Sequence, residues 1–193
     1  MMLFLSLIWM VSIASIFALR PLSLRTASIF QRSDTFTTAL DSSKDDTPKD
    51  RPFTLPAGQF KPKQSLGQNF LSDQNYVLKI CDAFTDKSLD GHRVVEIGPG
   101  PGALTRVLFQ RYPSMTAIEI DQRAVAFLGE KLPGLAVQHL DVLQADWASM
   151  AATRGGSLNI IANLPYYIVS QVLFSLADNH KAIDTAVVTM QVS

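Results

Sequence analysis

From about residue 60 onward, the sequence predicts an α/β fold in which a parallel sheet is covered by helices on both faces. Short apolar segments alternate with longer segments whose apolar residues recur at helical spacing, and glycine or proline often separates them. Strands and helices that alternate at these lengths are typical of a Rossmann-like sheet with right-handed crossovers. With 47% hydrophobic and 18% charged residues, the composition is ordinary for a folded domain.

The first expected elements are a helix over residues 73–84 and a strand over residues 93–97. The helix is predicted because four apolar residues recur at helical spacing, namely Val77, Ile80, Cys81 and Phe84. Asp73 stands where it can cap the helix N-terminus. The strand is a short apolar run that leads into glycines, as a buried strand does. Because Cys81 is the single cysteine and lies in the apolar pattern, we interpret it as a buried, unreactive thiol.

The later elements follow from the same two patterns. Pro133 and Gly134 end one helical segment, and short apolar runs mark the strands. In order, we expect a helix at 103–111, a strand at 114–120, a helix at 122–132, strands at 135–139 and 158–162, a helix at 168–177 and a strand at 186–190. The sequence stops at Ser193, just after that buried strand. A covered sheet seldom stops there, so we expect a fragment whose fold is incomplete after the fifth strand.

The strongest local motif runs from Glu96 to Gly102, with the sequence Glu-Ile-Gly-Pro-Gly-Pro-Gly. Glycines such as Gly98 and Gly100, placed between a strand and a helix, let the backbone approach a ligand closely. The spacing differs from the Gly-x-Gly-x-x-Gly of dinucleotide binders. An acidic residue before the turn would repel a pyrophosphate but suits a ligand with a cationic sulfonium and an amine. A tight structural turn and a dinucleotide site remain as alternatives.

Acidic residues also end the next two expected strands. Glu119 follows the glycines by about twenty residues, where a carboxylate can accept hydrogen bonds from a ribose diol. Asp121 is expected to cap the following helix. Asp141 ends the third strand, where it can accept from an adenine amino group while Val142 supplies a backbone N–H. We assign His139 no role.

The fourth strand ends in the sequence Asn163-Leu164-Pro165-Tyr166, which is the most informative tetrapeptide in the chain. Strand ends of this kind line the ligand crevice of an open parallel sheet. Asn163 offers a side-chain acceptor, Pro165 fixes the turn, and Tyr166 offers an aromatic face for a flat base. Such a set recurs in enzymes that methylate exocyclic amines. We interpret Tyr167 as a packing residue.

A further segment, residues 64–71, precedes the first helix and reads Gln-Ser-Leu-Gly-Gln-Asn-Phe-Leu. Its Phe70 and Leu71 can close over the methionine end of a cofactor. Lys61 and Lys63, just before it, can meet phosphates. Charge alone favours a solvated segment for the two lysines.

Taken together, these motifs resemble the ribosomal RNA adenine N6,N6-dimethyltransferase family, and specifically its small-subunit, KsgA-type branch. The resemblance covers about residues 61–191. It implies a Rossmann-like S-adenosylmethionine-dependent methyltransferase fold and dimethylation of adjacent adenines in small-subunit ribosomal RNA. It also implies that S-adenosylmethionine is the cofactor. The expected catalytic residues are Asn163, Leu164, Pro165 and Tyr166, and the expected cofactor-binding residues are Gln68, Asn69, Leu71, Gly98, Gly100, Glu119, Asp141, Val142 and Asn163.

Two other functions remain open from the sequence. One is methylation of large-subunit RNA by nearly the same site. The other is a non-catalytic family member that acts as an organelle transcription factor or ribosome-assembly factor. The resemblance also implies a C-terminal helical domain that helps to hold RNA, and we expect this chain to lack it. From Pro56 onward, 11 Lys and Arg stand against 12 Asp and Glu, so RNA affinity must come from a local patch or from that domain. We expect ribosomal RNA or the small ribosomal subunit as partner, no metal, and a monomer.

The N-terminal 33 residues differ from the rest. Residues 1–19 are apolar and uncharged, and they are followed by Arg20, Arg25 and Arg32 among hydroxyl residues, with no acid before Asp34. This order resembles the bipartite presequences of algae with complex plastids, so we predict a leader at 1–33 and a plastid location. A plain signal peptide, a signal anchor or a mitochondrial presequence are alternatives. After leader removal we expect no stable membrane association. Residues 34–59 read as a disordered linker before the catalytic domain at 60–193.

Overall fold

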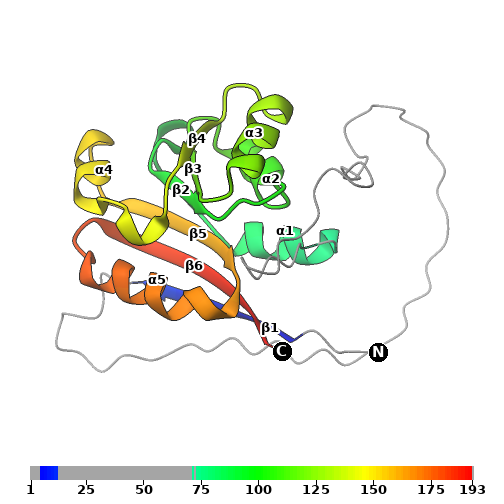
Figure 1. Ribbon diagram of the computed structural model, residues 1–193. Helices are drawn as coiled ribbons and strands as arrows, with labels where there is room; N and C mark the ends of the chain where they lie inside the picture. The colour runs from blue at the N-terminus through cyan, green and yellow to red at the C-terminus, as the bar shows by residue number, and fades with distance from the viewer. Residues whose placement is uncertain (1–4, 13–70, 72, 193) are drawn as a thin grey trace, which may run out of the picture.

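The computed structural model describes residues 5–12, 71 and 73–192, and these form one six-stranded sheet with helices on both faces (Figure 1). The strand order is β1-β6-β5-β2-β3-β4. All neighbouring strands run parallel except β1, which is antiparallel to β6. The strands are β1 (Leu5–Ser12), β2 (Val94–Ile97), β3 (Thr116–Glu119), β4 (Ala136–His139), β5 (Leu158–Leu164) and β6 (Ile183–Val192). The predicted Rossmann-like fold class is confirmed.

Two hydrophobic layers hold the helices to the sheet. The α-helices are α1 (Gln74–Ala83), α2 (Thr105–Arg111), α3 (Gln122–Lys131), α4 (Trp147–Thr153) and α5 (Tyr166–Asp178), and the short 3₁₀ helices are η4 (Leu89–Gly91) and η5 (Val142–Gln144). Helices α4 and α5 pack on one face of the sheet, through side chains such as Trp147 and Val172. Helices α1, α2 and α3 pack on the other face, through side chains such as Ile80, Leu108 and Leu128. Burial of this apolar surface is the main source of stability.

The central strands are covered on both sides, which explains their continuous apolar sequences. All four residues of β2 are buried, and so are six of the seven residues of β5. Alternate residues face opposite layers: Val95 belongs to the α4–α5 layer, whereas Val94 belongs to the α1–α3 layer. Strand β4 lies at the sheet edge and is largely exposed. The sheet therefore presents the carboxyl ends of β2, β3, β4 and β5 along one side.

Local signals in the sequence placed several helix ends correctly. The Asp73 side chain accepts a hydrogen bond from the Asn75 backbone N–H at 2.8 Å and caps α1. The Asp121 side chain accepts from the Arg123 N–H at 3.1 Å and caps α3. Both predicted caps are confirmed.

Helix α4 was not predicted, and α5 begins two residues earlier than expected. The signals for α4 were the cap at Asp146, whose side chain accepts from the Ser149 N–H at 2.9 Å, and the alanines that follow. A helix this short has little periodicity to detect. Helix α5 starts at Tyr166 because Pro165 at its N-cap needs no N–H partner there.

Strand β1 falls within the predicted leader. Its residues pair with β6 in a continuous antiparallel register that runs from Leu5 opposite Val192 to Ser12 opposite Thr185. This strand covers the outer edge of β6 in the present chain. The assignment of residues 1–33 as a leader and 34–59 as a linker stays a prediction, and residues 13–59 lie outside the described part. Among the described residues, no helix combines the length and the apolar character that a bilayer crossing requires.

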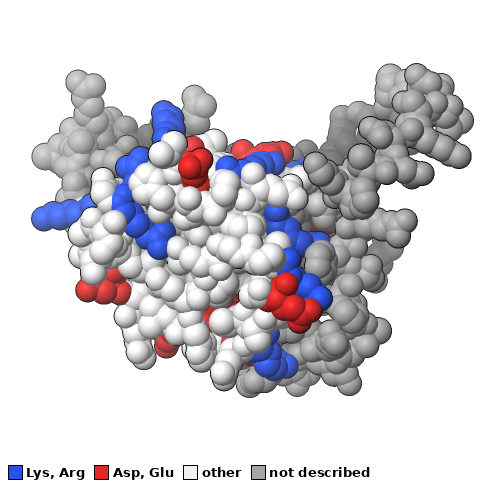
Figure 2. Space-filling view, turned by 90° about the horizontal axis from the view of Figure 1, so that it is seen from above, with Lys and Arg blue, Asp and Glu red and all other residues white. Residues whose placement is uncertain are grey.

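Charged side chains on the face shown in Figure 2 lie in separate groups around a broad uncharged middle. On this face, Lys and Arg form no continuous basic area. This distribution agrees with the near balance of charges in the sequence from Pro56 onward. Bulk charge therefore does not mark this face for nucleic acid.

Candidate active site

The loop between β2 and α2 brings backbone close to the sheet at Gly98. This residue has φ of 65°, a conformation that glycine adopts without strain. Its N–H donates to the Ile118 carbonyl oxygen at 2.9 Å, which fastens the loop to β3. A Cβ at this position would lie 3.1 Å from a methyl carbon of Leu164. The positive φ, together with the nearby Leu164 methyl, therefore favours glycine at this turn.

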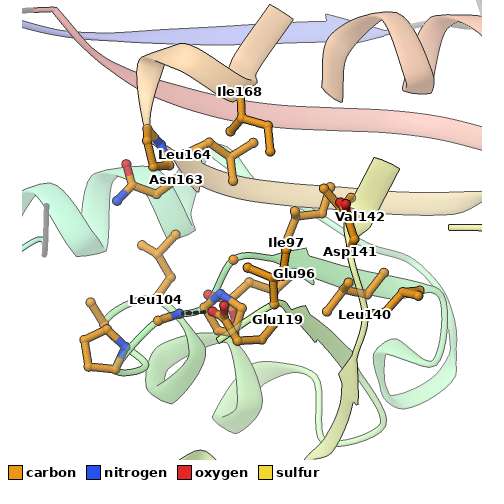
Figure 3. Close-up of a pocket in the computed structure, with 18 of the residues that line it drawn as sticks. Glu96, Ile97, Leu104, Glu119, Leu140, Asp141, Val142, Asn163, Leu164 and Ile168 are labelled. Atoms are coloured by element: carbon orange, nitrogen blue, oxygen red, sulfur yellow. Dashed lines mark hydrogen bonds between the residues drawn. The ribbon is translucent and has the colours of Figure 1, made fainter. Parts of the chain in front are cut away.

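Glu119, at the end of β3, fastens the same loop to the sheet through its carboxylate. Its Oε2 accepts the Gly100 backbone N–H at 2.9 Å, the bond drawn as a dashed line in Figure 3. Its Oε1 accepts the Asp121 N–H at 2.8 Å. The side chain is buried, yet it lines the pocket described next. A carboxylate has about four acceptor positions, so Glu119 can still accept from a ligand hydroxyl.

The strand ends surround one pocket of about 1000 Å³, its open mouth included (Figure 3). Glu119 comes from β3, Asp141 follows β4, and Asn163 comes from β5. Most of the predicted site residues line it, namely Leu71, Gly98, Gly100, Glu119, Asp141, Val142, Asn163, Leu164 and Pro165. Residues that sequence reasoning did not assign also contribute, among them Leu104, Ile118, Leu140, Tyr167 and Ile168. The fold thus brings together residues as far apart in the chain as Leu71 and Ile168.

Glu96, at the third position of β2, is the least ordinary side chain of the pocket. It is 1% exposed and one carboxyl oxygen, Oε2, has no hydrogen-bond partner. Burial, together with the nearby charge of Glu119, raises its pKa to about 8. The Thr105 hydroxyl is likewise buried without a hydrogen-bond partner. Near neutral pH the ligand-free site therefore holds a mainly protonated carboxyl, whose ionised form would be favoured by a cationic group bound beside it.

Replacement of Glu96 by glutamine is expected to stabilise the ligand-free chain at alkaline pH. The folded state keeps the Glu96 proton up to a pKa of about 8, whereas the unfolded state loses it near the ordinary value of 4.5. The unfolded state alone therefore gains charge between these values, and wild-type stability falls as pH rises between them. Glu96→Gln removes this loss. By pH 9 it should gain on the order of 5 kcal/mol relative to its effect at pH 4.

Urea unfolding of both chains at pH 4, 6.5 and 9 measures this difference. Glu130→Gln is the matched control, since the Glu130 side chain is exposed and pairs only with Lys131. Parallel stability curves for wild type and Glu96→Gln would show that the Glu96 carboxyl ionises normally in the folded state.

Burial also explains why the thiol of Cys81 is expected to be unreactive. Its side chain is fully buried on α1, and burial together with the charge of Glu96 raises the pKa of its thiol to about 12. Such a thiol forms almost no thiolate near neutral pH.

Asp141 lies at the turn after β4, at the rim of the pocket. Its Oδ1 accepts the Leu143 N–H at 3.0 Å and so caps the short helix η5. Leu140 is fixed to the same edge by the bond from its N–H to the Glu119 carbonyl oxygen at 3.0 Å. The cap leaves the second carboxyl oxygen for a donor on a ligand. Val142, the next residue, is buried against the α4–α5 layer.

Asn163 and the residues after it form the last wall of the pocket. The Asn163 Oδ1 lies 2.8 Å from the Thr189 hydroxyl oxygen of β6. Thr189 is 1% exposed and was not assigned by sequence reasoning. The signal for it was a single polar residue within the otherwise apolar run of the predicted strand at 186–190.

The two tyrosines lie differently from what the sequence suggested. Tyr167, interpreted as packing, lines the pocket, whereas Tyr166 does not line it and is 69% exposed. Their rings meet edge to face with centroids 6.3 Å apart. Tyr166 is the first residue of α5, and it stands in the chain between Pro165 and Tyr167, which both line the pocket. Its predicted role as a stacking platform stays a prediction.

Some predicted site residues lie outside the described part of the chain. These are Gln68 and Asn69, together with Lys61, Lys63 and Phe70. Leu71, the described member of that segment, lines the pocket. Within the described ranges, no three His, Cys, Asp or Glu side chains are grouped so that they could hold a metal ion.

Comparison with known proteins gives one consistent result. The family model for ribosomal RNA adenine dimethylases matches residues 59–193. A ribosomal RNA small subunit methyltransferase A from Salinibacter ruber is 47% identical over 132 residues, which cover 68% of this chain and 44% of that protein. The protein of the same name from Chlorobium luteolum is 41% identical over 129 residues, covering 67% and 46%.

Among solved structures, the 23S rRNA methyltransferase ErmE is similar with a TM-score of 0.53 and 30% identity, over 63% of this chain and 48% of that chain. The chain spans about half the length of the curated relatives it matches. The matched region contains the glycine loop and all the strand ends that line the pocket. The chain belongs to the ribosomal RNA adenine dimethylase family.

Proposed function

We propose that this chain carries the catalytic site of an enzyme that dimethylates N6 of adjacent adenines in small-subunit ribosomal RNA, with S-adenosylmethionine as methyl donor. The observation that carries the proposal is the meeting of Gly98, Glu119, Asp141 and Asn163 around one pocket. The names of the relatives support the substrate, since those with 47% and 41% identity are small-subunit methyltransferases.

The residues present fit this cofactor. The unpaired, buried carboxyl oxygen of Glu96 suits the positive charge of the methionine amine or the sulfonium. Glu119 would accept hydrogen bonds from the ribose diol, and Asp141 would accept one from the adenine amino group. The Gly98–Gly100 loop leaves room for the cofactor beside it. When bound, S-adenosylmethionine supplies an electrophilic methyl group to this site. The pocket needs no strong general base, because an alkylated adenine amine releases its proton readily.

The residues of this chain would orient a weak nucleophile, the N6 amine of adenine. The lone pair of adenine N6 is delocalised into the ring, so it must be turned out of conjugation. The Asn163 side chain and the Leu164 carbonyl would accept hydrogen bonds from the N6 amine and hold it in place. Once the target adenine has left the RNA helix, Tyr166 would stack on it, a contact worth roughly 1–3 kcal/mol. The exposure of Tyr166 supports this role.

Two measurements on the chain test the proposal. S-adenosylmethionine should bind with one-to-one stoichiometry in calorimetry, and a labelled methyl group should pass to unmodified small-subunit RNA. Mapping of the methylated adenines separates the small-subunit target from the large-subunit target that the similarity to ErmE keeps as an alternative. Cofactor binding without transfer to either RNA would favour a non-catalytic assembly or transcription factor. No cofactor binding would refute the proposal.

We also propose that residues 1–33 direct the protein to a plastid. The apolar segment followed by arginines and hydroxyl residues without acids supports this location. A fluorescent reporter fused to residues 1–55 should enter the plastid of an alga with complex plastids. A cytosolic or mitochondrial reporter would contradict the proposal.

A further inference from the structure

The side chain of Thr189 contacts the site without lining the pocket. Strands β5 and β6 place Thr189 opposite Asn163 in their parallel register. The Thr189 Oγ1 lies 2.8 Å from the Asn163 Oδ1 and 3.3 Å from the Ala162 carbonyl oxygen. Because Thr189 is 1% exposed, water cannot replace either partner easily. The Asn163 amide thus has one buried protein partner, and its other end is left for the pocket.

A threonine hydroxyl has one hydrogen to donate and two lone pairs that accept. With Oδ1 toward Thr189, the hydroxyl donates to that oxygen, and the Asn163 NH₂ group is left for the pocket. After a half-turn of the amide, Nδ2–H donates to Oγ1, and the hydroxyl hydrogen passes to the Ala162 carbonyl. The amide oxygen is then left for the pocket. Both arrangements satisfy every group, so the hydroxyl supports either orientation.

We propose that Thr189 is a positioning residue that fixes the place and plane of the Asn163 amide, from which the amide oxygen can be presented to the amine of the methyl acceptor. The inference rests on the proposed function, since only an amine substrate needs an acceptor at this point. Thr189 would accept from Asn163 Nδ2–H and donate to the Ala162 carbonyl. The amide oxygen then meets the substrate without reorientation during the reaction.

An aliphatic residue of the same shape cannot replace Thr189 in positioning the Asn163 amide. Thr189→Val keeps the branched side chain and its packing but removes both hydrogen-bonding functions. The Asn163 amide would then lose its buried partner, and its plane would no longer be fixed from β6. We expect kcat for methyl transfer to fall about 10- to 100-fold, while the Kd for S-adenosylmethionine changes less than about twofold. Thr189→Ser, which keeps the hydroxyl, should restore most of kcat.

The side-chain amide signals of Asn163 in a ¹⁵N-labelled chain give a second readout that does not depend on activity. In Thr189→Val these signals should shift and exchange faster with water, whereas Thr189→Ser should keep them. Thr116→Val is the matched control. Thr116 is a buried threonine of β3 whose hydroxyl accepts from Arg154, on a different strand from Asn163. That variant should lose stability and leave kcat per folded molecule and the Asn163 signals unchanged.

Unchanged kcat and unchanged Asn163 signals in Thr189→Val would overturn the inference, and so would a serine variant as impaired as the valine variant. Failure of the proposed function looks different. In that case the wild-type chain itself binds no S-adenosylmethionine and transfers no methyl group. The amide signals would still decide whether Thr189 holds Asn163.

Discussion

Asn163→Ala is expected to lower the single-turnover rate of methyl transfer by about 10²- to 10³-fold, with little change in the Kd for S-adenosylmethionine. The substitution removes the side-chain acceptor for the N6 amine at the end of β5. The groups proposed to hold the cofactor, Glu119, Asp141 and the Gly98–Gly100 loop, are left in place. The loss should therefore appear in the chemical step and not in cofactor binding.

Rapid-quench measurements with saturating RNA and cofactor give the rate, and calorimetry gives the Kd. Asn179→Ala is a suitable control, because the Asn179 amide bonds only the Ser175 carbonyl at the far end of α5. It removes the same chemical group away from the pocket and should leave the rate unchanged. An Asn163→Ala chain with the wild-type rate would exclude the proposed role of this side chain.

Glu119→Ala is expected to weaken binding of S-adenosylmethionine by at least about 100-fold. Two effects act together. The ribose loses its proposed carboxylate partner, and the N–H groups of Gly100 and Asp121 lose the acceptor that now holds the glycine loop on β3. A buried N–H without a partner costs about 1–3 kcal/mol, so the ligand-free chain should also unfold more easily.

The measurement is the shift in melting temperature caused by the cofactor, together with the Kd from calorimetry. The cofactor should raise the melting temperature of the wild type and leave that of Glu119→Ala nearly unchanged. Glu119→Gln, which keeps one acceptor oxygen, should show a shift in melting temperature between those of the wild type and Glu119→Ala. Glu130→Ala removes an exposed carboxylate of α3 and should bind like the wild type. Wild-type affinity in Glu119→Ala would place the ribose elsewhere.

Most of the fold could be predicted because its signals are local. Apolar runs, helical spacing, the caps at Asp73 and Asp121 and the glycine motif each lie within a few residues of the element they determine. The same holds for the strand ends: the rule that parallel strands end on one side of a sheet is enough to group Glu119, Asp141 and Asn163. Helix α4 escaped prediction because a helix of seven residues, about two turns, carries little periodicity.

The contacts between side chains could not be predicted in this way, because they depend on strand register and on helix starts. A shift of β6 by one residue would turn Thr189 to the opposite face of the sheet and away from Asn163. Likewise, the start of α5 directly after Pro165 decides that Tyr167 lines the pocket while Tyr166 faces outward. The amino-acid sequence by itself determined which groups could do chemistry and at which strand ends they stand. Only the packed sheet decided which of them touch, since hydrogen bonds form within about 3 Å and a one-residue step along a strand exceeds that distance.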